Sequence, residues 1–270
     1  MKKCLSLLLA ALMLAAVLTG CGGNPSTEET DTPADTGTEQ AAQTNWNVSS
    51  VTGTGTELKF RTGGDQGTYY GFGSVLAQAI TTNGNGTKVT AVVSNGSQDN
   101  IEQMQMNVAQ LGFVQSDVMS YAYNGERLFE GVPVTNFSTV AALYMEQVQI
   151  VTTNPAIKTV ADLAGKSVSI GAPGSGVYFN AIDVLGAYGL TENDIKPTYQ
   201  SFGDSADALK NGQIDAAFIV AGAPTTAVTD LATTKDTYLV SLDSEHIAKL
   251  LETSDYYTET VIAKDVYFGD

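Results

Sequence analysis

Two kinds of hydrophobic periodicity alternate along the chain from Leu58 onward. Short apolar runs at residues 58–61 and 89–93 predict β-strands. Between them, apolar side chains recur with the spacing of one helix face, at Phe72, Val75, Leu76, Ala79 and Ile80. Strands that alternate with helices predict an α/β fold with mainly parallel sheets.

The same alternation continues almost to the C-terminus. We expect strands at residues 111–114, 139–144, 148–152, 167–170, 214–220 and 238–242, and helices after Ser97, after Gly176, over 204–211 and over 244–251. Residues 214–220 are apolar on both faces, which is typical of a buried parallel strand. Ser97 is a residue type that caps helix N-termini well. Similar turn-to-helix sequences at 67–70 and 176–179 favour two similar lobes.

The N-terminus has a different pattern. Two lysines precede an apolar run over residues 5–17, which ends at Leu18-Thr19-Gly20-Cys21. This pattern predicts a secretory signal over residues 1–20, and its end resembles the bacterial lipobox, in which the cysteine is lipidated. The apolar run is too short for a spanning helix. An ordinary signal peptide with an incidental cysteine is the alternative.

Residues 21–56 contain almost no large apolar side chain. Threonine, glycine, alanine and unpaired acidic residues dominate this stretch. Because such a segment cannot bury enough surface to offset its ordering entropy, we predict a disordered tether that holds the folded part away from the membrane. Cys4 lies inside the signal, so the folded part has no cysteine for a disulfide or thiol chemistry.

The excess of acidic over basic residues disfavours negatively charged macromolecules and lipids as partners. The chain has 29 acidic against 13 basic residues and a net charge of −16, so we expect no binding to nucleic acid or to anionic lipid headgroups. An acidic excess also serves solubility in secreted proteins. Arg61 and Arg127 are the only arginines. An anionic ligand would therefore depend mainly on backbone N–H groups and hydroxyls.

Three glycine-rich turns precede predicted helices, at residues 63–70, 94–97 and 171–176. The free N–H groups and the dipole of a helix N-terminus bind anions. In open α/β sheets such turns converge at the carboxyl ends of the strands. Each turn alone has a purely structural explanation. The three together, with hydroxyls at Thr68, Ser97 and Ser175, favour a binding cleft.

The sequence gives little support for nucleotide binding, catalysis or metal binding. Residues 171–176 have the glycine spacing of a phosphate-binding loop, but Val177-Tyr178 replaces the required Lys-Ser/Thr pair. His246 is the only histidine, and no nucleophile elbow or metal-binding cluster is present in the sequence. We therefore predict a binding protein without cofactor or metal. Aromatic and polar residues could line its pocket, although core packing is the alternative for each: Tyr69, Tyr70, Tyr144, Phe218, Gln115 and Ser116.

Several segments together resemble one known family. They include 62–70, 113–118, 121–125, 157–166, 171–176, 204–224 and 256–258. In order and spacing these segments are similar to the TAXI family of TRAP transporter solute receptors. The resemblance implies a two-lobe, type II periplasmic-binding-protein fold at the outer face of the cytoplasmic membrane. It also implies that the protein delivers a small carboxylate, such as glutamate, glutamine or a related organic acid, to an ion-driven permease.

The resemblance also implies a site and a domain division. The family's cleft corresponds here to Gly67, Thr68, Tyr69 and Tyr70, to Gln115, Ser116 and Asp117, and to Gly174, Ser175 and Gly176. Lobe one would comprise 57–145 and 242–270, lobe two 146–241, with hinge crossings near Tyr144 and Leu242. Arg61 departs from the family pattern. Relatives continue with a further strand and helices, so the chain is expected to be short at its C-terminal end. A ligand-sensing protein and a lipid-anchored enzyme are the alternatives.

Overall fold

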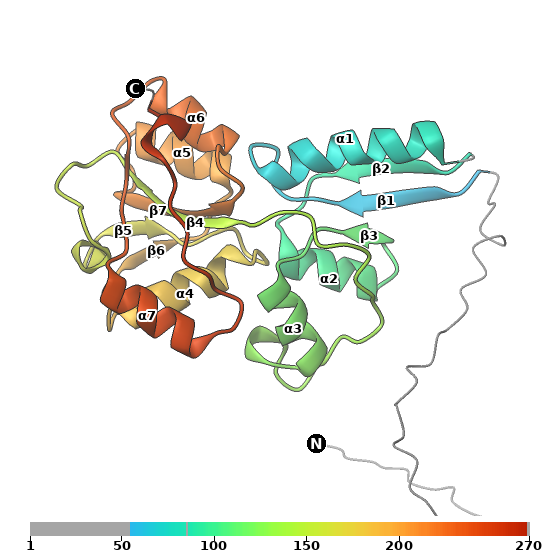
Figure 1. The fold of residues 1–270 in the computed structure, drawn as a ribbon, viewed down its shortest axis with the longest axis horizontal. Helices are drawn as coiled ribbons and strands as arrows, with labels where there is room; N and C mark the ends of the chain where they lie inside the picture. The colour runs from blue at the N-terminus through green and yellow to red at the C-terminus, as the bar shows by residue number, and fades with distance from the viewer. Residues whose placement is uncertain (1–54, 85, 269–270) are drawn as a thin grey trace, which may run out of the picture. The chain divides into compact units, whose positions relative to one another are not determined.

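The protein was analysed as a computed structural model, which describes residues 55–84 and 86–268. The predicted signal, most of the predicted tether and the lipidation site Cys21 lie outside these residues. The described residues form two β-sheets with helices on the faces of each (Figure 1). None of the helices in these two ranges is long and apolar enough to cross a membrane.

The first sheet is entirely parallel. Its strands lie in the order β2-β1-β3, with β1 at Glu57–Arg61, β2 at Lys88–Val92 and β3 at Leu111–Gly112. Helix α1 (Thr68–Asn83) lies along one face, and α2 (Ser97–Gln105) and α3 (Ser116–Asn124) lie on the other (Figure 1). The pairing of Phe60 with Ala91 and Leu111 places an aromatic ring at the middle of this sheet.

The second sheet is mixed. Its order is β6 (Lys196–Thr198), β5 (Ser167–Ser169), β7 (Ala216–Ala221), β4 (Gln147–Thr152) and β8 (Tyr238–Leu239). The strands β5, β6 and β7 run parallel, whereas β4 runs antiparallel to β7 and β8. All six residues of β7 are buried, as its continuous apolar run predicts.

Helices cover both faces of the second sheet. Helices α5 (Phe202–Lys210) and α6 (Thr226–Ala232) lie on one side, and α4 (Val177–Ala187) and α7 (Ser244–Thr253) lie on the other (Figure 1). Short 3-10 helices occupy the connections: η2 (Arg127–Phe129), η3 (Val160–Leu163), η4 (Glu192–Asp194) and η5 (Lys264–Val266). The α/β fold class with mainly parallel strands is thus confirmed.

Two local predictions differ from the structure. Ser97 is the first residue of α2, while Gly96, with a φ of 114° that favours glycine, holds the capping position. The hydroxyl of Ser97 instead accepts the N–H of Gln115. Residues 139–144, predicted as a strand, form no strand and pair with neither described sheet.

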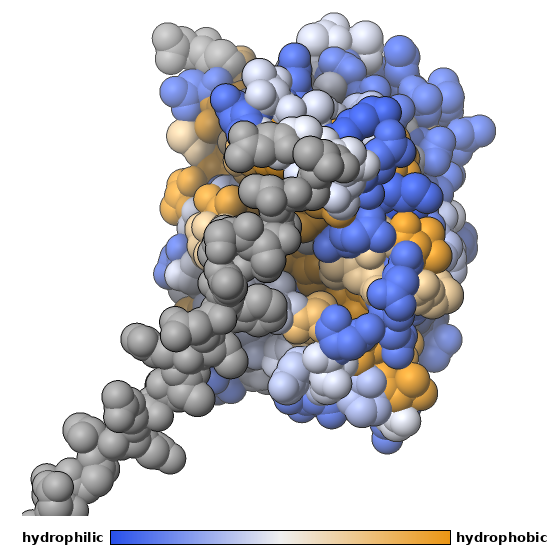
Figure 2. Space-filling model, turned by 90° about the vertical axis from the view of Figure 1, so that its right-hand side faces the viewer, coloured by the Kyte–Doolittle hydropathy of each residue, from blue (hydrophilic) through white to orange (hydrophobic). Residues whose placement is uncertain are grey.

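Residues 137–146 instead form one wall of an apolar groove of about 460 Å³ beside the first sheet. Phe60, Leu76, Ile80 and Phe113 contribute side chains to the groove. Figure 2 shows apolar side chains gathered in a hollow on this face of the molecule. Helices and loops therefore cover the faces of the first sheet less completely than those of the second.

The C-terminal segment also differs from the expected division, which places residues 242–270 with lobe one. Helix α7 packs against α4, and its Leu250 belongs to the core beneath the second sheet. Tyr267 packs against the apolar cluster beneath α5 and α6. Within the described range these contacts join the segment to the second sheet, because the apolar face of α7 is buried there.

Candidate ligand-binding site

A cavity of about 60 Å³ lies where loops from both sheets meet. The loops that follow β1, β2 and β3 line it from the first sheet, and the loops that follow β5 and β6, together with the carboxyl end of β7, line it from the second. The lining residues are Gly63, Gly64, Gly67, Thr68, Tyr69, Ser94, Asn95, Gly96, Ser97, Gln115, Glu146, Ala172, Ser175, Gly176, Val177, Gln200, Ser201, Phe202, Val220 and Ala221. The site therefore lies at the carboxyl ends of the strands, where α/β folds bind ligands.

Four helices begin at the wall of this cavity. They start at Thr68 (α1), Ser97 (α2), Val177 (α4) and Phe202 (α5), and all four residues line the cavity. First-turn N–H groups have no partner within their own helix and carry partial positive charge. Ser175, next to the start of α4, is only 4% exposed, and its hydroxyl makes no hydrogen bond with any described residue. These donors suit an anionic group.

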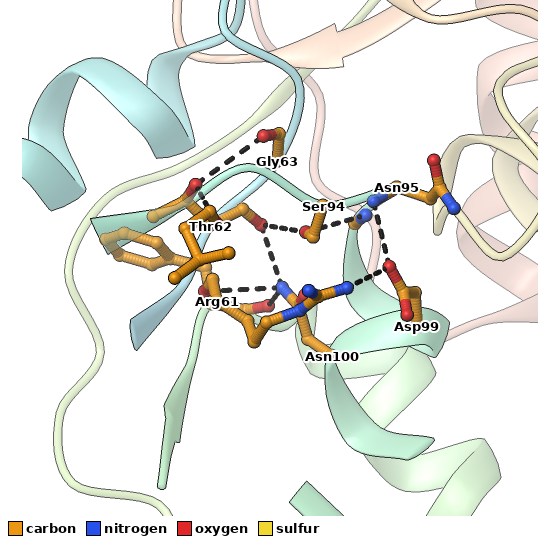
Figure 3. A network of polar contacts seen from close by, with 10 residues as sticks. Arg61, Thr62, Gly63, Ser94, Asn95, Asp99 and Asn100 are labelled. Carbon is orange, nitrogen blue, oxygen red and sulfur yellow. Dashed lines mark hydrogen bonds and ion pairs between the residues drawn. The ribbon is translucent and has the colours of Figure 1, made fainter. Parts of the chain in front are cut away.

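The loop after β2 is held in place by an ion pair (Figure 3). The Arg61 guanidinium lies 2.6 Å from the Asp99 carboxylate, and both side chains are largely buried. The same carboxylate oxygen accepts the backbone N–H of Asn95 at 3.0 Å. Arg61 does not line the cavity. Its charge orders the loop and is not directed at the ligand space.

The ends of the three strands of the first sheet are joined by Asn100, which is fully buried. Its amide nitrogen donates to the carbonyl oxygens of Thr62 and Phe113, each at 2.8 Å. The Ser94 hydroxyl donates to the same Thr62 carbonyl at 3.0 Å (Figure 3). One amide thus fixes the positions at which three loops leave the sheet.

Loops of the two sheets contact each other directly around the cavity. The N–H of Asp99 donates to the carbonyl of Gly174 at 2.9 Å, and the Thr68 hydroxyl donates to the carbonyl of Gly222 at 3.1 Å. A Cβ atom at Gly176 would lie 1.7 Å from the Oε1 of Gln115. A larger residue at position 176 would therefore displace the Gln115 side chain from its place at the cavity.

A buried polar network continues from the cavity through Gln115. Its amide nitrogen donates to Asn180 Oδ1 at 2.6 Å. Asn180 in turn donates to Asp117 Oδ2 at 3.0 Å and to the Tyr257 hydroxyl at 2.9 Å. Burial raises the pKa of Asp117, although its hydrogen bonds oppose this shift. The network links α3 of the first sheet with α4 of the second.

Glu146 is the only residue with a formal charge among the described residues that line the cavity. It directly precedes β4, in the segment that joins the two sheets. Its Oε2 accepts a hydrogen bond from the Tyr69 hydroxyl at 2.9 Å. Burial raises the pKa of Glu146 to about 8, and burial also raises the pKa of Tyr69 well above its ordinary value.

Seven of the predicted site residues line this cavity: Gly67, Thr68, Tyr69, Ser97, Gln115, Ser175 and Gly176. Ser116, Asp117 and Tyr144 line the apolar groove, and Gly174 offers its carbonyl to Asp99. Tyr70 is half-buried in α1 and lines neither space.

Phe218 is placed differently from the prediction. It is 1% exposed and packs in the core between the second sheet and α4. It occupies the middle of β7, whereas the cavity touches that strand near its carboxyl end, at Val220 and Ala221. A central strand position therefore serves packing and not binding.

Sequence reasoning missed Glu146 and the loop after β6. That loop supplies Gln200, Ser201 and Phe202 to the cavity. The spacing of Ser201 and Asp204 is a helix-start signal, and the Ser201 hydroxyl does accept the Asp204 N–H. Glu146 is a lone acidic residue in an otherwise apolar and amide-rich stretch, which was the available signal.

A protein-family model described as the NMT1-like family matches residues 60–270. The chain belongs to the NMT1-like family. This match covers both sheets and every loop that lines the cavity.

Solved structures resemble this NMT1-like chain at low identity. A protein from Bordetella bronchiseptica RB50 is 21% identical, with 68% of this chain and 56% of that one covered and a TM-score of 0.53. The alkanesulfonate-binding protein SsuA from Xanthomonas axonopodis pv. citri is 20% identical, with coverages of 70% and 61% and a TM-score of 0.49. An amino acid ABC transporter substrate-binding protein, AbpA from Streptococcus pneumoniae, is 20% identical, with coverages of 69% and 76% and a TM-score of 0.47.

At these identities the likeness concerns the fold alone. The chain spans between 56% and 61% of the length of the Bordetella and Xanthomonas proteins. The predicted α/β fold class, with mainly parallel strands flanked by helices, agrees with the two observed sheets, and the two-lobe, type II periplasmic-binding-protein arrangement stays a prediction. Ligand and transport partner require arguments from the site.

Proposed function

We propose that this NMT1-like protein is an extracytoplasmic receptor that binds a small carboxylate for a TRAP-type secondary transporter, with a lipid on Cys21 as its anchor. It is not an enzyme in this proposal. The observation that carries the proposal is the buried Ser175 hydroxyl, which has no partner among the described residues and lies in a cavity at which four helices begin. Such donors bind an anion without arginine.

The two sheets would act as two lobes that close over the ligand. Residues 57–145 would form lobe one and residues from 146 onward lobe two, with a hinge at 144–146. The direct bonds across the cavity, such as Asp99 N–H to Gly174, would then break on opening. Small-angle scattering should show compaction on ligand addition. An unchanged radius of gyration with a ligand that demonstrably binds would contradict closure.

A thermal-shift series tests the ligand class, with L-glutamate, L-glutamine, 2-oxoglutarate and succinate as probes. A ligand at a hundred times its dissociation constant stabilises the folded state by about 2.7 kcal/mol. Ser175→Ala should weaken binding roughly ten- to a hundredfold, because a hydrogen bond to a charged group contributes about 1.5–3 kcal/mol. Ser244→Ala, at an exposed position outside the cavity, is the matched control.

Calorimetry on both variants decides between models of the site. Equal affinity of Ser175→Ala and the wild type would overturn the anion site at the start of α4. The anchor and the transporter need separate tests. Cys21→Ser should release the protein from membranes. Uptake in vesicles that contain the cognate permease should follow an ion gradient, and a requirement for ATP would contradict the TRAP assignment.

A further inference from the structure

The electrostatics of the cavity are unbalanced. Four helix starts offer partial positive charge, yet the only formal charge among the described lining residues is the negative charge that Glu146 can carry. No lysine, arginine or histidine lines the cavity within the described ranges. None of the ion pairs found among these residues involves Glu146. The cavity thus has donors for an anion and, separately, an acceptor without a cation.

The contacts of Glu146 leave one of its oxygens available. Oε2 accepts from the Tyr69 hydroxyl at 2.9 Å, and Oε1 makes no hydrogen bond with any described residue. Glu146 is half-buried, and withdrawing a carboxylate even partly from water costs free energy unless a cation or several donors compensate it. Asp117 adds a second negative charge nearby, which makes the surroundings more favourable to a cation.

Glu146 is not needed to hold the Tyr69 side chain in position. The Tyr69 ring stacks on Phe113 with ring centroids 4.8 Å apart and an interplanar angle of 16°. It also meets Tyr144 edge-on at 6.4 Å. These two aromatic contacts fix the ring, and Tyr69 would need no buried acid to hold it. The direction of the hydrogen bond suggests the converse, that Tyr69 orients Glu146.

We propose that Glu146 binds a protonated amine of the ligand, so that the substrate is a small amino-bearing acid. This inference rests on the proposed receptor function. The acid group lies at the starts of α1, α2 and α4 beside Ser175, and the ammonium group donates to Oε1 of Glu146. Tyr69 is a positioning residue that keeps the carboxylate turned into the cavity.

Matched probe pairs that differ only in the amino group test this role. Suitable pairs are glycine and acetate, L-alanine and propionate, L-glutamate and glutarate, and taurine and ethanesulfonate. Calorimetry on the full chain at pH 8.5, above the pKa of about 8 to which burial raises Glu146, compares the wild type with Glu146→Gln, which keeps the shape of the side chain and removes its charge. Glu126→Gln is the matched control, because Glu126 is exposed and lies outside the cavity.

We expect the wild type to bind the amino member of at least one pair tenfold or more tightly than its partner. Glu146→Gln should lose roughly ten- to a hundredfold in affinity for that member, as expected for a charge-assisted hydrogen bond. Its affinity for the amine-free member should stay within about threefold of the wild type. Glu126→Gln should retain the preference. Tyr69→Phe should fall between the wild type and Glu146→Gln, and it tests the role independently if Glu146→Gln fails to fold.

The contrary results separate this inference from the proposed function. If both members of each pair bind equally, or the amine-free acid binds more tightly, the role of Glu146 is overturned and the carboxylate receptor stands. If Glu146→Gln keeps the amine preference, the role is likewise overturned. If none of the eight probes binds, the inference and the small-acid receptor are both contradicted.

Discussion

The two sheets of this protein are stabilised in different ways. Around the second sheet, the described residues form two core clusters of sixteen and nine buried apolar residues. Two smaller clusters lie beside the first sheet: one of seven buried apolar residues around α2 and α3, and one of four between the sheet and α1, which comprises Phe60, Ala77, Val89 and Phe113. The apolar groove beside the first sheet remains open (Figure 2). Burial thus contributes far more to the second sheet than to the first.

The first sheet compensates with buried polar contacts. Asn100 and the pair of Arg61 with Asp99 tie the loops that leave β1, β2 and β3 (Figure 3). Hydrogen bonds are directional, so they fix loop geometry more sharply than apolar packing does. The cavity takes half of its lining residues from this less covered sheet. Loop geometry at the site therefore depends on a few polar side chains.

The largest effect should come from the core of the second sheet. Phe218→Ala should lower the free energy of unfolding by about 3–5 kcal/mol, because it leaves a cavity in a fully buried cluster. Phe72→Ala is the matched change next to the first sheet. Phe72 is 40% exposed, so that change should cost less than about 1.5 kcal/mol. Urea denaturation of both variants gives the two values. Equal losses would show that the two regions do not differ as their burial indicates.

A second effect tests the polar contacts of the first sheet. Asn100→Ala removes the donor to two buried carbonyl groups, and we expect a loss of about 1–3 kcal/mol in unfolding free energy. Ligand affinity should fall as well, because three cavity loops lose their common tie. Asn124→Ala, at an exposed position of α3, is the matched control and should change stability by less than about 0.5 kcal/mol. Wild-type stability and affinity in Asn100→Ala would refute the role of this amide.

The same contrast explains what the sequence could predict. Residues 214–220 are apolar throughout, and their pattern predicts a buried strand that the structure contains as β7. The helix over 72–80 follows equally directly from its spacing. Glycine-rich turns indicate helix starts, and hence Thr68, Ser97 and Ser175 at the cavity. Local sequence patterns thus predict the helices and strands, and they also predict the glycine-rich turns whose backbone lines the site.

Residues whose role depends on distant partners could not be predicted. Residues 139–144 have a strand-like composition, but a strand also needs a neighbouring strand to pair with. Sequence periodicity does not reveal which segments become neighbours, and here the edge strand β3 does not pair with this segment. Phe218 and Val220 are both apolar residues of β7. Only their positions along the strand differ: Phe218 lies in the core, whereas Val220 lies near the carboxyl end and lines the cavity. Glu146 acquires its role through Tyr69, which is 77 residues away along the chain.

A third effect is a dependence of stability on pH. The folded-state pKa of Glu146 is raised from its ordinary value of 4.5 to about 8, with burial as the main cause. The folded state thus favours the protonated form. This contribution to stability is complete below about pH 4.5 and is lost as pH rises to about 8. The unfolding free energy should therefore fall over this range, by at most about 1.36 kcal/mol per pH unit for one proton.

Glu146→Gln should flatten that profile, whereas Glu126→Gln should leave it unchanged. Tyr69, Tyr144 and Asp117 also face this carboxyl group. Burial raises the pKa of Asp117, so part of the slope should remain in the Glu146→Gln variant. The two tyrosines titrate above this range, because burial raises the pKa of each. Urea midpoints measured from pH 5 to pH 8.5 give the profiles, and identical slopes in Glu146→Gln and the wild type would contradict the assignment.

The smallest effect concerns the exposed edge of the first sheet. Lys88 in β2 pairs with Glu57 in β1 at 3.0 Å, and the two side chains are 62% and 74% exposed. Water screens such a pair, and holding two long side chains costs entropy, so Lys88→Met should change the unfolding free energy by less than about 0.5 kcal/mol. Arg61→Met provides the contrast, because the Arg61 and Asp99 side chains are only 17% and 15% exposed. Removing Arg61 leaves a largely buried carboxylate with fewer donors and should cost several times more. Raising the salt concentration to 1 M should remove the small contribution of Lys88 while leaving most of the contribution of Arg61. If both variants lose the same stability and respond equally to salt, the first sheet is not held by its buried polar contacts.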